Sequence, residues 1–379
     1  MIDELLSAIE KTFPIPGRFR SKLPKDIAEL SRLLTSARGE RENSYLNQPK
    51  LLSAYLRYFL PWNVFRLNKI FMLTTLPALS DGDAITDLGS GPLVLPIALW
   101  LAFPRLRRTE LEFRCVDKSA AALEAGYKLF KELSAAGSDL TAWKIKIIHD
   151  SMEKPVRGKA AKLAAALNVF NEISGSSNKT EHNAEKAAAL LSKLCADNGS
   201  IFVMEPGNPQ GGTFIAALRA SLLEKGHFPF APCTHAGPCP LLQDTVGKAK
   251  WCHFAHKTNI ETKTKAVPAA LHKLSAAAGI PKERAAFSFL LTDRTDRHIS
   301  TVPQLRIRII SDVFSVSLGR KNINMGCYGC SEIGLVLVAG NKTKLNAVSF
   351  GSLLELPFPK DEQSDKQWDS KSGAMVVYI

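Results

Sequence analysis

The chain has 379 residues, enough for about two domains with a sizeable core. Hydrophobic residues make up 45% and charged residues 22%, and these ordinary proportions exclude a disordered or fibrous chain. The net charge of +13 favours a polyanionic partner, of which nucleic acid is the commonest.

Three features bear on the compartment. The seven cysteines form an odd number, and the chain does not open with a basic segment followed by an apolar one, which argues against a secreted, disulfide-bonded protein. The longest apolar stretch, residues 92–104, is far shorter than the roughly 20 residues that span a bilayer. We therefore expect a cytoplasmic protein with reduced thiols and no membrane partner.

Residues 1–80 are predicted to form a helical N-terminal region, because apolar residues recur there at helical spacing between Pro/Gly breaks. Over residues 81–228, short β runs alternate with Ala- and Leu-rich helices, which predicts βαβ units and a mainly parallel sheet. In chain order we expect strands at 84–88, 111–116, 145–148, 162–170 and 201–204, and helices at 93–103, 120–133 and 184–195.

After that last helix, Asp197-Asn198-Gly199 predict a left-handed cap. Residues 229–256 lack regular periodicity, and such a long irregular loop needs an external organiser. We assign residues 229–345 to a cysteine-rich, metal-binding and basic β region that completes the sheet. Residues 346–379 are expected to form a C-terminal tail. Strands in the region 229–345 are expected at 286–291, 304–310 and 334–339.

A nucleotide-site pattern lies in the segment ITDLGSGP, residues 85–92. Asp87, Gly89, Ser90 and Gly91 fall between a strand and a helix, where glycine lets the backbone approach a ligand and the helix N-terminus offers free N–H groups. Asp117 ends the next strand, where a carboxylate can bind both ribose hydroxyls.

Together these residues resemble a class I S-adenosylmethionine-dependent methyltransferase with a Rossmann-like α/β sheet. The resemblance implies that Asp150 and Ser151, after the third strand, flank the adenine. Asn168, after the fourth strand, either faces the methyl donor or caps a helix. No Asn-Pro-Pro-Tyr motif and no suitably placed cysteine pair marks a methyl acceptor site, so we assign no catalytic residue and leave open whether the protein is an enzyme.

Four cysteines occur in Pro- and Gly-rich segments. Cys233, Cys239 and Cys252 have the spacing Cys-x5-Cys-x12-Cys, and Cys330 lies much further along the chain. Thiolates in such loops can converge on a metal, which would organise the irregular loop. Spacing alone does not choose between zinc and iron–sulfur, because three histidines that suit zinc are interspersed: His235, His253 and His256.

The segments 205–212, 231–240 and 251–254, with the lead-in segments 36–39, 45–49 and 54–56, resemble the small-ribosomal-subunit Rsm-type methyltransferase-like family. Its members include bacterial homologues and the mitochondrial methyltransferase-like assembly factors. The resemblance implies a four-iron four-sulfur cluster on Cys233, Cys239, Cys252 and Cys330, and a role on the small ribosomal subunit or its 16S-type rRNA. Cys327 is a neighbour that competes with Cys330 as fourth ligand.

Positive charge is concentrated between residues 245 and 325, which hold 14 Lys and Arg against 5 Asp and Glu. Such a stretch favours phosphate contacts. Arg306 and Arg308 alternate with apolar residues, so a strand would place both on one face, and Arg320 and Lys321 follow in a turn. We expect these four residues to contact nucleic-acid phosphates, and the family resemblance implies that the nucleic acid is RNA.

The sequence thus predicts an S-adenosylmethionine-binding, iron–sulfur-containing protein that acts on the small ribosomal subunit or its rRNA, as an assembly factor or an rRNA methyltransferase. Two alternatives stay open. One is an RNA methyltransferase with a structural zinc, and the other is a cluster-bearing redox sensor with a vestigial methyltransferase fold.

Overall fold

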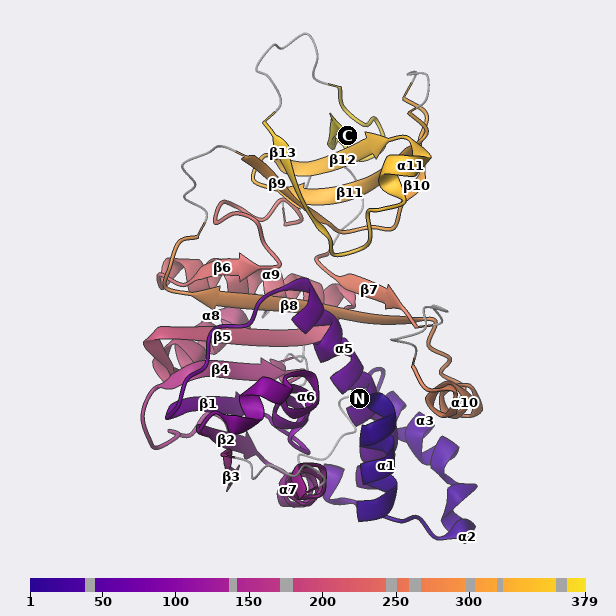
Figure 1. The fold of residues 1–379 in the computed structure, drawn as a ribbon, viewed down its shortest axis with the longest axis vertical. Helices are drawn as coiled ribbons and strands as arrows, with labels where there is room; N and C mark the ends of the chain where they lie inside the picture. The colour runs from indigo at the N-terminus through magenta and orange to yellow at the C-terminus, as the bar shows by residue number, and fades with distance from the viewer. Residues whose placement is uncertain are drawn as a thin grey trace. The chain divides into compact units, whose positions relative to one another are not determined.

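The computed structural model describes residues 1–37, 45–135, 142–170, 180–242, 251–258, 267–297, 304–318, 323–358 and 367–379. Figure 1 shows the helices and strands of the chain as a ribbon. The chain divides into two compact units. The first comprises Met1–Ser176, Leu190–Ser200 and His256–Ala285, and the second comprises Ser177–Ala189, Ile201–Ala255 and Ala286–Ile379.

The first unit begins with helices. The first of them, α1, is amphipathic and buries Leu5 and Ile9, and it packs against α5 and α7. A π-helical turn, η3, separates α4 from α5, and α10 contacts both α3 and η3. The bounds of these elements are α1 (Ile2–Thr12), α2 (Gly17–Arg20), α3 (Leu23–Leu34), η2 (Tyr45–Asn47), α4 (Pro49–Ala54), η3 (Tyr55–Phe59), α5 (Leu60–Leu73) and α10 (Ala269–Ala277).

A parallel sheet forms the rest of the first unit, in the order β3-β2-β1-β4. Its central strands are almost continuously buried, as expected for strands covered on both faces. This order and the connecting helices confirm the expected Rossmann-like α/β fold. The elements are β1 (Asp83–Leu88), α6 (Val94–Ala102), η4 (Pro104–Arg108), β2 (Leu111–Asp117), α7 (Ala120–Ala135), β3 (Lys144–His149) and β4 (Ala161–Leu167).

The strand β5 (Cys195–Pro206) starts directly after α8 (Thr180–Leu194) and continues from the first unit into the second. The left-handed cap predicted at Asp197-Asn198-Gly199 is wrong, because these residues belong to the strand and Gly199 has no positive φ. A Cβ on Gly199 would lie 2.6 Å from the carbonyl oxygen of Ala161. The glycine therefore permits close approach to the start of β4 and does not end a helix.

In the second unit, the remainder of β5 is followed in the sheet by β8 and β6, and β6 pairs antiparallel with β8. The region expected as an irregular loop, residues 229–256, includes part of β6 and β7, while residues 243–250 lie outside the described residues. The elements are α9 (Pro209–Glu224), β6 (Phe228–Ala231), β7 (Phe254–Lys257) and β8 (Arg284–Asp293).

A separate six-stranded sheet completes the second unit, in the order β13-β9-β11-β12-β14 with β10 paired to β11. Leu305, Ile307 and Val338 are among the buried residues on one of its faces. The sequence predicted a tail for residues 346–379, yet two strands of this sheet lie there. The elements are β9 (Gln304–Ile309), β10 (Phe314–Ser315), β11 (Met325–Ser331), β12 (Gly334–Gly340), α11 (Lys342–Leu345), β13 (Leu353–Pro357) and β14 (Met375–Tyr378).

Within the part of the chain that the structure describes, every helix is too short or too polar to span a bilayer.

Candidate functional site

The turn between β1 and α6 is held by a buried carboxyl group. Asp87 is 1% exposed, and its Oδ2 accepts a hydrogen bond of 2.6 Å from Oγ of Ser90. Burial raises the pKa of Asp87 to about 7; the Ser90 hydrogen bond opposes this shift and the charge of Asp117 adds to it. The carboxyl group is thus a fixed part of the turn, and it titrates near neutral pH.

The two glycines of the turn have different surroundings. Both have positive φ, +63° at Gly89 and +51° at Gly91, a conformation that only glycine adopts readily. A Cβ on Gly89 would lie 2.5 Å from Cγ2 of Val169, whereas a Cβ on Gly91 would meet no protein atom within 4 Å. Gly89 therefore makes room for the segment after β4, and Gly91 borders the open space that a ligand would need.

Asp117 connects the end of β2 to the same turn. Its Oδ2 accepts from the backbone N–H of Gly91 and its Oδ1 from that of Ser119, both at 2.8 Å. Burial raises the pKa of this carboxyl group, and the two backbone hydrogen bonds oppose the shift. Each oxygen keeps a further lone pair for a ligand hydroxyl.

The residues expected around the adenine lie at the end of β3. The backbone N–H of Asp150 donates to the carbonyl of Asp117 at 3.1 Å, which brings this segment to the end of β2. The Asp150 carboxylate accepts from the Ser151 N–H at 2.8 Å and pairs with Lys154 at 2.9 Å, and these contacts lower its pKa, the Lys154 bond most strongly.

Asn168 follows β4 with a φ of +58°. Leu93, in the turn before α6, also has a φ of +58° and is fully buried. Non-glycine residues in this conformation carry strain of about 1–3 kcal/mol and cluster at functional sites. The acids, glycines and Asn168 thus all lie at the carboxyl ends of adjacent parallel strands, where α/β sheets bind ligands.

Asn47 is a neighbour of this edge that sequence reasoning missed. Its Oδ1 accepts from Oγ of Ser119 at 2.8 Å and from the N–H of Ala121 at 3.4 Å, at the start of α7. The asparagine lies in the segment 45–49, which was one of those that carried the family resemblance. Nothing in the sequence showed that this segment would contact the start of α7.

All seven cysteines are free thiols, and four of them gather in the second unit. Burial raises the pKa of Cys252 well above its usual value, and the thiols of Cys233, Cys239 and Cys330 raise it further. Sγ of Cys330 lies 4.0 Å from Nε2 of His235. The structure therefore brings together the four cysteines that the sequence singled out.

Cys327 belongs elsewhere. It lies in β11 three residues before Cys330, is fully buried and packs in the apolar cluster of Leu305 and Val336. Burial raises its pKa to about 11. Cys330, and not Cys327, neighbours the other three thiols. Even so, no group of three or more His, Cys, Asp or Glu side chains in the described part of the chain has a ready metal-binding arrangement.

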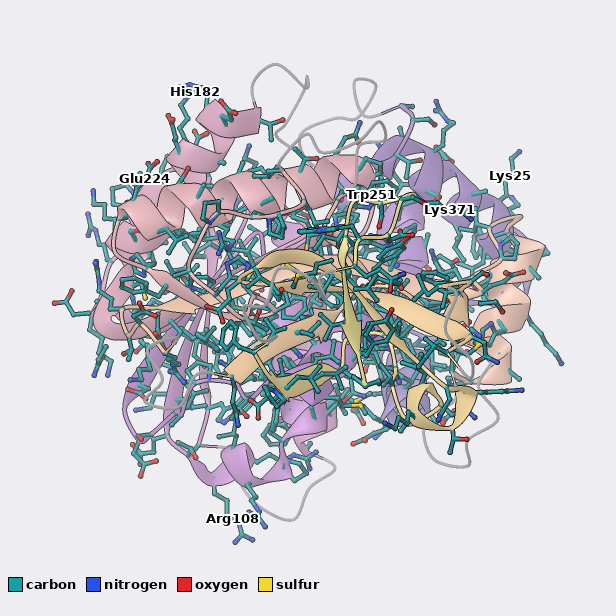
Figure 2. All side chains as sticks on the ribbon, turned by 90° about the horizontal axis from the view of Figure 1, so that it is seen from above. Lys25, Arg108, His182, Glu224, Trp251 and Lys371 are labelled. Carbon is teal, nitrogen blue, oxygen red and sulfur yellow. The ribbon has the colours of Figure 1, made fainter. Side chains whose placement is uncertain are left out.

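The segment that carries Cys252 packs against the start of α9. Nε1 of Trp251, labelled in Figure 2, donates to the carbonyl of Gly207 at 3.2 Å. Asn208 caps α9 by accepting from the Gly211 N–H at 2.8 Å. Oγ of Ser288 donates to the carbonyl of Cys252 at 2.6 Å. The motif at 205–212 thus supports one of the four thiols.

The predicted RNA contacts divide into three groups. Arg306 is partly exposed, and its Nε lies 3.3 Å from Oε1 of Glu355. Arg308 is 7% exposed and donates to the backbone carbonyls of Pro232 and Gly351. These residues, distant from Arg308 in sequence, cover its face of β9, so a phosphate cannot reach it. Arg320 and Lys321 lie outside the described residues.

A family model, "Mitochondrial small ribosomal subunit Rsm22", matches residues 83–316, which is more than half of the chain and includes the β1–α6 turn, Asp117 and three of the four thiols. The chain belongs to the Rsm22 family. This match and the Rossmann-like topology confirm the predicted methyltransferase-like α/β fold and the family predicted from the motifs.

Comparisons with solved structures give distant matches, and comparison with curated proteins gives none. Geranyl diphosphate methyltransferase in complex with GPP and sinefungin is 13% identical, with 72% of this chain and 98% of that chain covered and a TM-score of 0.34. Precorrin-6y C5,15-methyltransferase from Geobacter metallireducens is 9% identical, with 61% and 87% covered and a TM-score of 0.34. Scores of this size do not bear on function.

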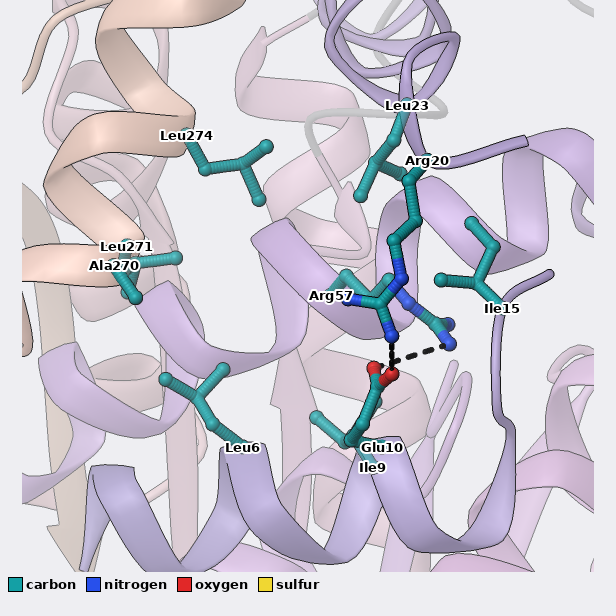
Figure 3. Close-up of a pocket in the computed structure, with 10 residues that line it drawn as sticks. All are labelled: Leu6, Ile9, Glu10, Ile15, Arg20, Leu23, Arg57, Ala270, Leu271 and Leu274. Atoms are coloured by element: carbon teal, nitrogen blue, oxygen red, sulfur yellow. Dashed lines mark hydrogen bonds and ion pairs between the residues drawn. The ribbon is translucent and has the colours of Figure 1, made fainter. Parts of the chain in front are cut away.

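This Rsm22-family chain also has a cavity of about 330 Å³ in its helical region (Figure 3). Leucines and isoleucines of α1, α3 and α10 line most of it. At one end Glu10 lies between Arg20 and Arg57, and the Arg57 Nη2 to Glu10 Oε2 distance is 3.9 Å. These charges balance one another in part, and nothing in the cavity indicates a particular ligand.

Proposed function

We propose that the protein binds S-adenosylmethionine at the carboxyl ends of β1 to β4 and acts on the small ribosomal subunit or its rRNA. One observation supports the cofactor assignment most: the Asp117 carboxylate is fixed beside Gly91, whose missing side chain leaves open space. In this arrangement Asp117 would bind the ribose hydroxyls and the β1–α6 turn would accommodate the methionine part of the cofactor.

The remaining cofactor contacts follow from strand positions. Asp150 and Ser151 would flank the adenine, and Asn168 would face the methyl donor. Asp87, Gly89 and Ser90 would hold the turn and not contact the cofactor directly, because Asp87 is buried against Ser90 and Gly89 is packed against Val169.

The ribosomal role is proposed from the family and the charge. The description of the Rsm22 family names the mitochondrial small ribosomal subunit. The basic stretch between residues 245 and 325 would supply phosphate contacts, with Arg306 on β9 and with Arg320 and Lys321. A site for the methyl-accepting base would make the protein an rRNA methyltransferase, and without one it would assist assembly.

We also propose a four-iron four-sulfur cluster on Cys233, Cys239, Cys252 and Cys330. The donor set fits, because the four thiols are neighbours, all partly shielded from solvent, and sulfur is the ligand atom that holds iron–sulfur clusters and structural zinc. A bound cluster would supply structural organisation of residues 229–256 or electron transfer. Zinc on the same residues, in an RNA methyltransferase, is the alternative, and a redox-sensing role is the third.

Three measurements test the proposal. Calorimetry with S-adenosylmethionine should show binding, and its absence would leave the fold without the cofactor. Metal analysis and a visible spectrum of anaerobically purified protein should show iron with broad absorption. Stoichiometric zinc without iron would replace the cluster by the zinc alternative. Methyl transfer to isolated small subunits separates an enzyme from an assembly factor.

A further inference from the structure

Arg219 is a buried cation in α9, 4% exposed. Its Nη2 donates to the carbonyls of His235 and Gly237, both at 2.7 Å. These two carbonyls lie in the short segment between Cys233 and Cys239. The Nε–H of Arg219 has no hydrogen-bond partner among the described residues.

Arg308 reaches the same segment from β9. Its Nε donates to the carbonyl of Pro232, immediately before Cys233, and its Nη1 to the carbonyl of Gly351, both at 2.9 Å. Because one arginine lies in a helix and the other in a strand of the second sheet, the segment 232–237 is fixed to two separate elements of the second unit.

The charges of the two arginines are unusual for a protein interior. A buried cation is normally paired with a carboxylate, as Arg114 is with Glu112 at 2.9 Å. Within the described ranges, no carboxylate pairs with Arg219 or Arg308. The groups of opposite potential charge near both are the thiols of Cys233 and Cys330.

The charges of Arg219 and Arg308 would balance the charge of a metal site on the four thiols. Four thiolates around a zinc ion, or around a cluster core of the same charge, leave a net charge of about −2. Two guanidinium groups offset that charge for either metal. A thiolate or cluster sulfur would also accept the unused N–H of Arg219, since hydrogen bonds to charged acceptors are the stronger ones.

We propose that Arg219 and Arg308 are positioning residues of the four-thiol site, which hold the Cys233–Cys239 segment in place and neutralise the bound thiolates. The charge-balancing part rests on the proposed metal site; the holding part does not. Arg308, expected from the sequence to contact RNA, thereby acquires a role inside the protein.

The experiment compares Arg308→Met, Arg308→Lys, Arg219→Met and Arg219→Lys with Arg306→Met. Arg306→Met is a matched control, because that residue lies two positions from Arg308 on the same strand with a partly exposed side chain. Circular dichroism and thermal melting identify any variant that fails to fold, and the Lys variants preserve the charge where a Met variant does not fold.

The first readout is metal retention in anaerobically purified protein challenged with a chelator. The Met variants should release metal about tenfold faster than the wild type, since each loses charge-assisted hydrogen bonds. The Lys variants should recover part of this loss, and Arg306→Met should release metal at the wild-type rate. If iron is bound, a redox titration should show a lower potential in the Met variants, because removing a positive charge disfavours reduction.

The second readout is alkylation of the metal-free protein by iodoacetamide, followed residue by residue. Cys233 and Cys239 should react faster in the Met variants than in the wild type or Arg306→Met. A wild type that binds no metal but shows this difference removes the proposed metal site and keeps the holding role. Folded Met variants that match the wild type in both readouts overturn the inference.

Discussion

The backbone N–H of Gly91 donates to Oδ2 of Asp117 at 2.8 Å, so the carboxylate at the end of β2 is fixed by the turn that follows β1. The same carboxylate accepts from Ser119, at the start of α7. Its orientation is therefore set before any ligand arrives, and a preorganised acceptor binds a ligand with less loss of entropy.

Asp117→Ala should weaken S-adenosylmethionine binding by about 1.5–3 kcal/mol, because charge-assisted hydrogen bonds to the ribose are lost. Calorimetry measures the change. Asp83→Ala is the control, since Asp83 lies at the opposite end of β1, where its Oδ2 accepts from the Ser80 N–H. Equal affinity of wild type and Asp117→Ala would contradict the assignment.

Gly89→Ala should mainly lower stability, whereas Gly91→Ala should mainly weaken cofactor binding. Both carry the backbone penalty of positive φ, about 1 kcal/mol or more. In Gly89→Ala the new Cβ also collides with Val169, so the melting temperature should fall further. Gly91→Ala, which has room for its Cβ in the protein, should lose cofactor binding with the smaller loss of stability. Unchanged binding by folded Gly91→Ala would place the ligand elsewhere.

Asp87 predicts a pH dependence of stability. Its pKa is about 7 in the folded protein and near 3.8 when exposed, so between these values the folded state holds a proton that the unfolded state has released. The free energy of unfolding should therefore fall as pH rises from about 4 to about 7, by an amount on the order of 4 kcal/mol, and level off above. Asp87→Asn should remove this slope. Denaturant unfolding at four pH values, without cofactor, provides the comparison.

Cys330→Ser and Cys327→Ser form a second matched pair, three residues apart on β11. Cys330→Ser should abolish metal retention in anaerobically purified protein, since it removes one of four proposed ligands. Cys327→Ser should retain the metal and lose about 1–3 kcal/mol of stability, because a hydroxyl replaces a thiol in an apolar cluster. Loss of metal from Cys327→Ser alone would reverse the assignment of the fourth ligand.

Arg306 should contribute to RNA binding and Glu355 should limit that contribution. Arg306→Gln is expected to flatten the dependence of log affinity on log salt by about one unit. Glu355→Gln removes the competing carboxylate at 3.3 Å and should strengthen binding. Sedimentation with small ribosomal subunits at several salt concentrations tests both. Identical behaviour of Arg306→Gln and wild type would exclude a phosphate contact there.

The strand edge was predictable because its signals are local. An acid and two glycines between a strand and a helix predict the turn in which they lie, and Asp117 marks the end of the next strand. The sequence did not show that Gly89 accommodates Val169 while Gly91 faces open space, because that difference depends on the segment after β4, about 80 residues away in the chain.

The surroundings of the thiols were harder to predict. Alternation on β9 placed Arg306 and Arg308 on one face but did not reveal that Pro232 and Gly351 cover only the second of them. The Gly-Cys-Tyr-Gly-Cys run of β11 has no clear alternation, so it left Cys327 and Cys330 unresolved. Arg219 did carry a signal, as the single charged residue between Thr213 and Leu223, and a lone cation in an apolar helix indicates a buried partner.

The passage of β5 from one unit to the other has a consequence for fragments of this chain. The chain changes unit after Ser176, Ala189, Ser200, Ala255 and Ala285, and the change after Ser200 falls inside a strand. A cut after Ala189, Ser200 or Ala255 leaves each fragment with pieces of both units, and a cut after Ser176 or Ala285 divides one of the units between the fragments. Limited proteolysis should therefore yield fragments that stay associated and lose structure together when separated, as expected when neither half of a protein is contiguous in sequence.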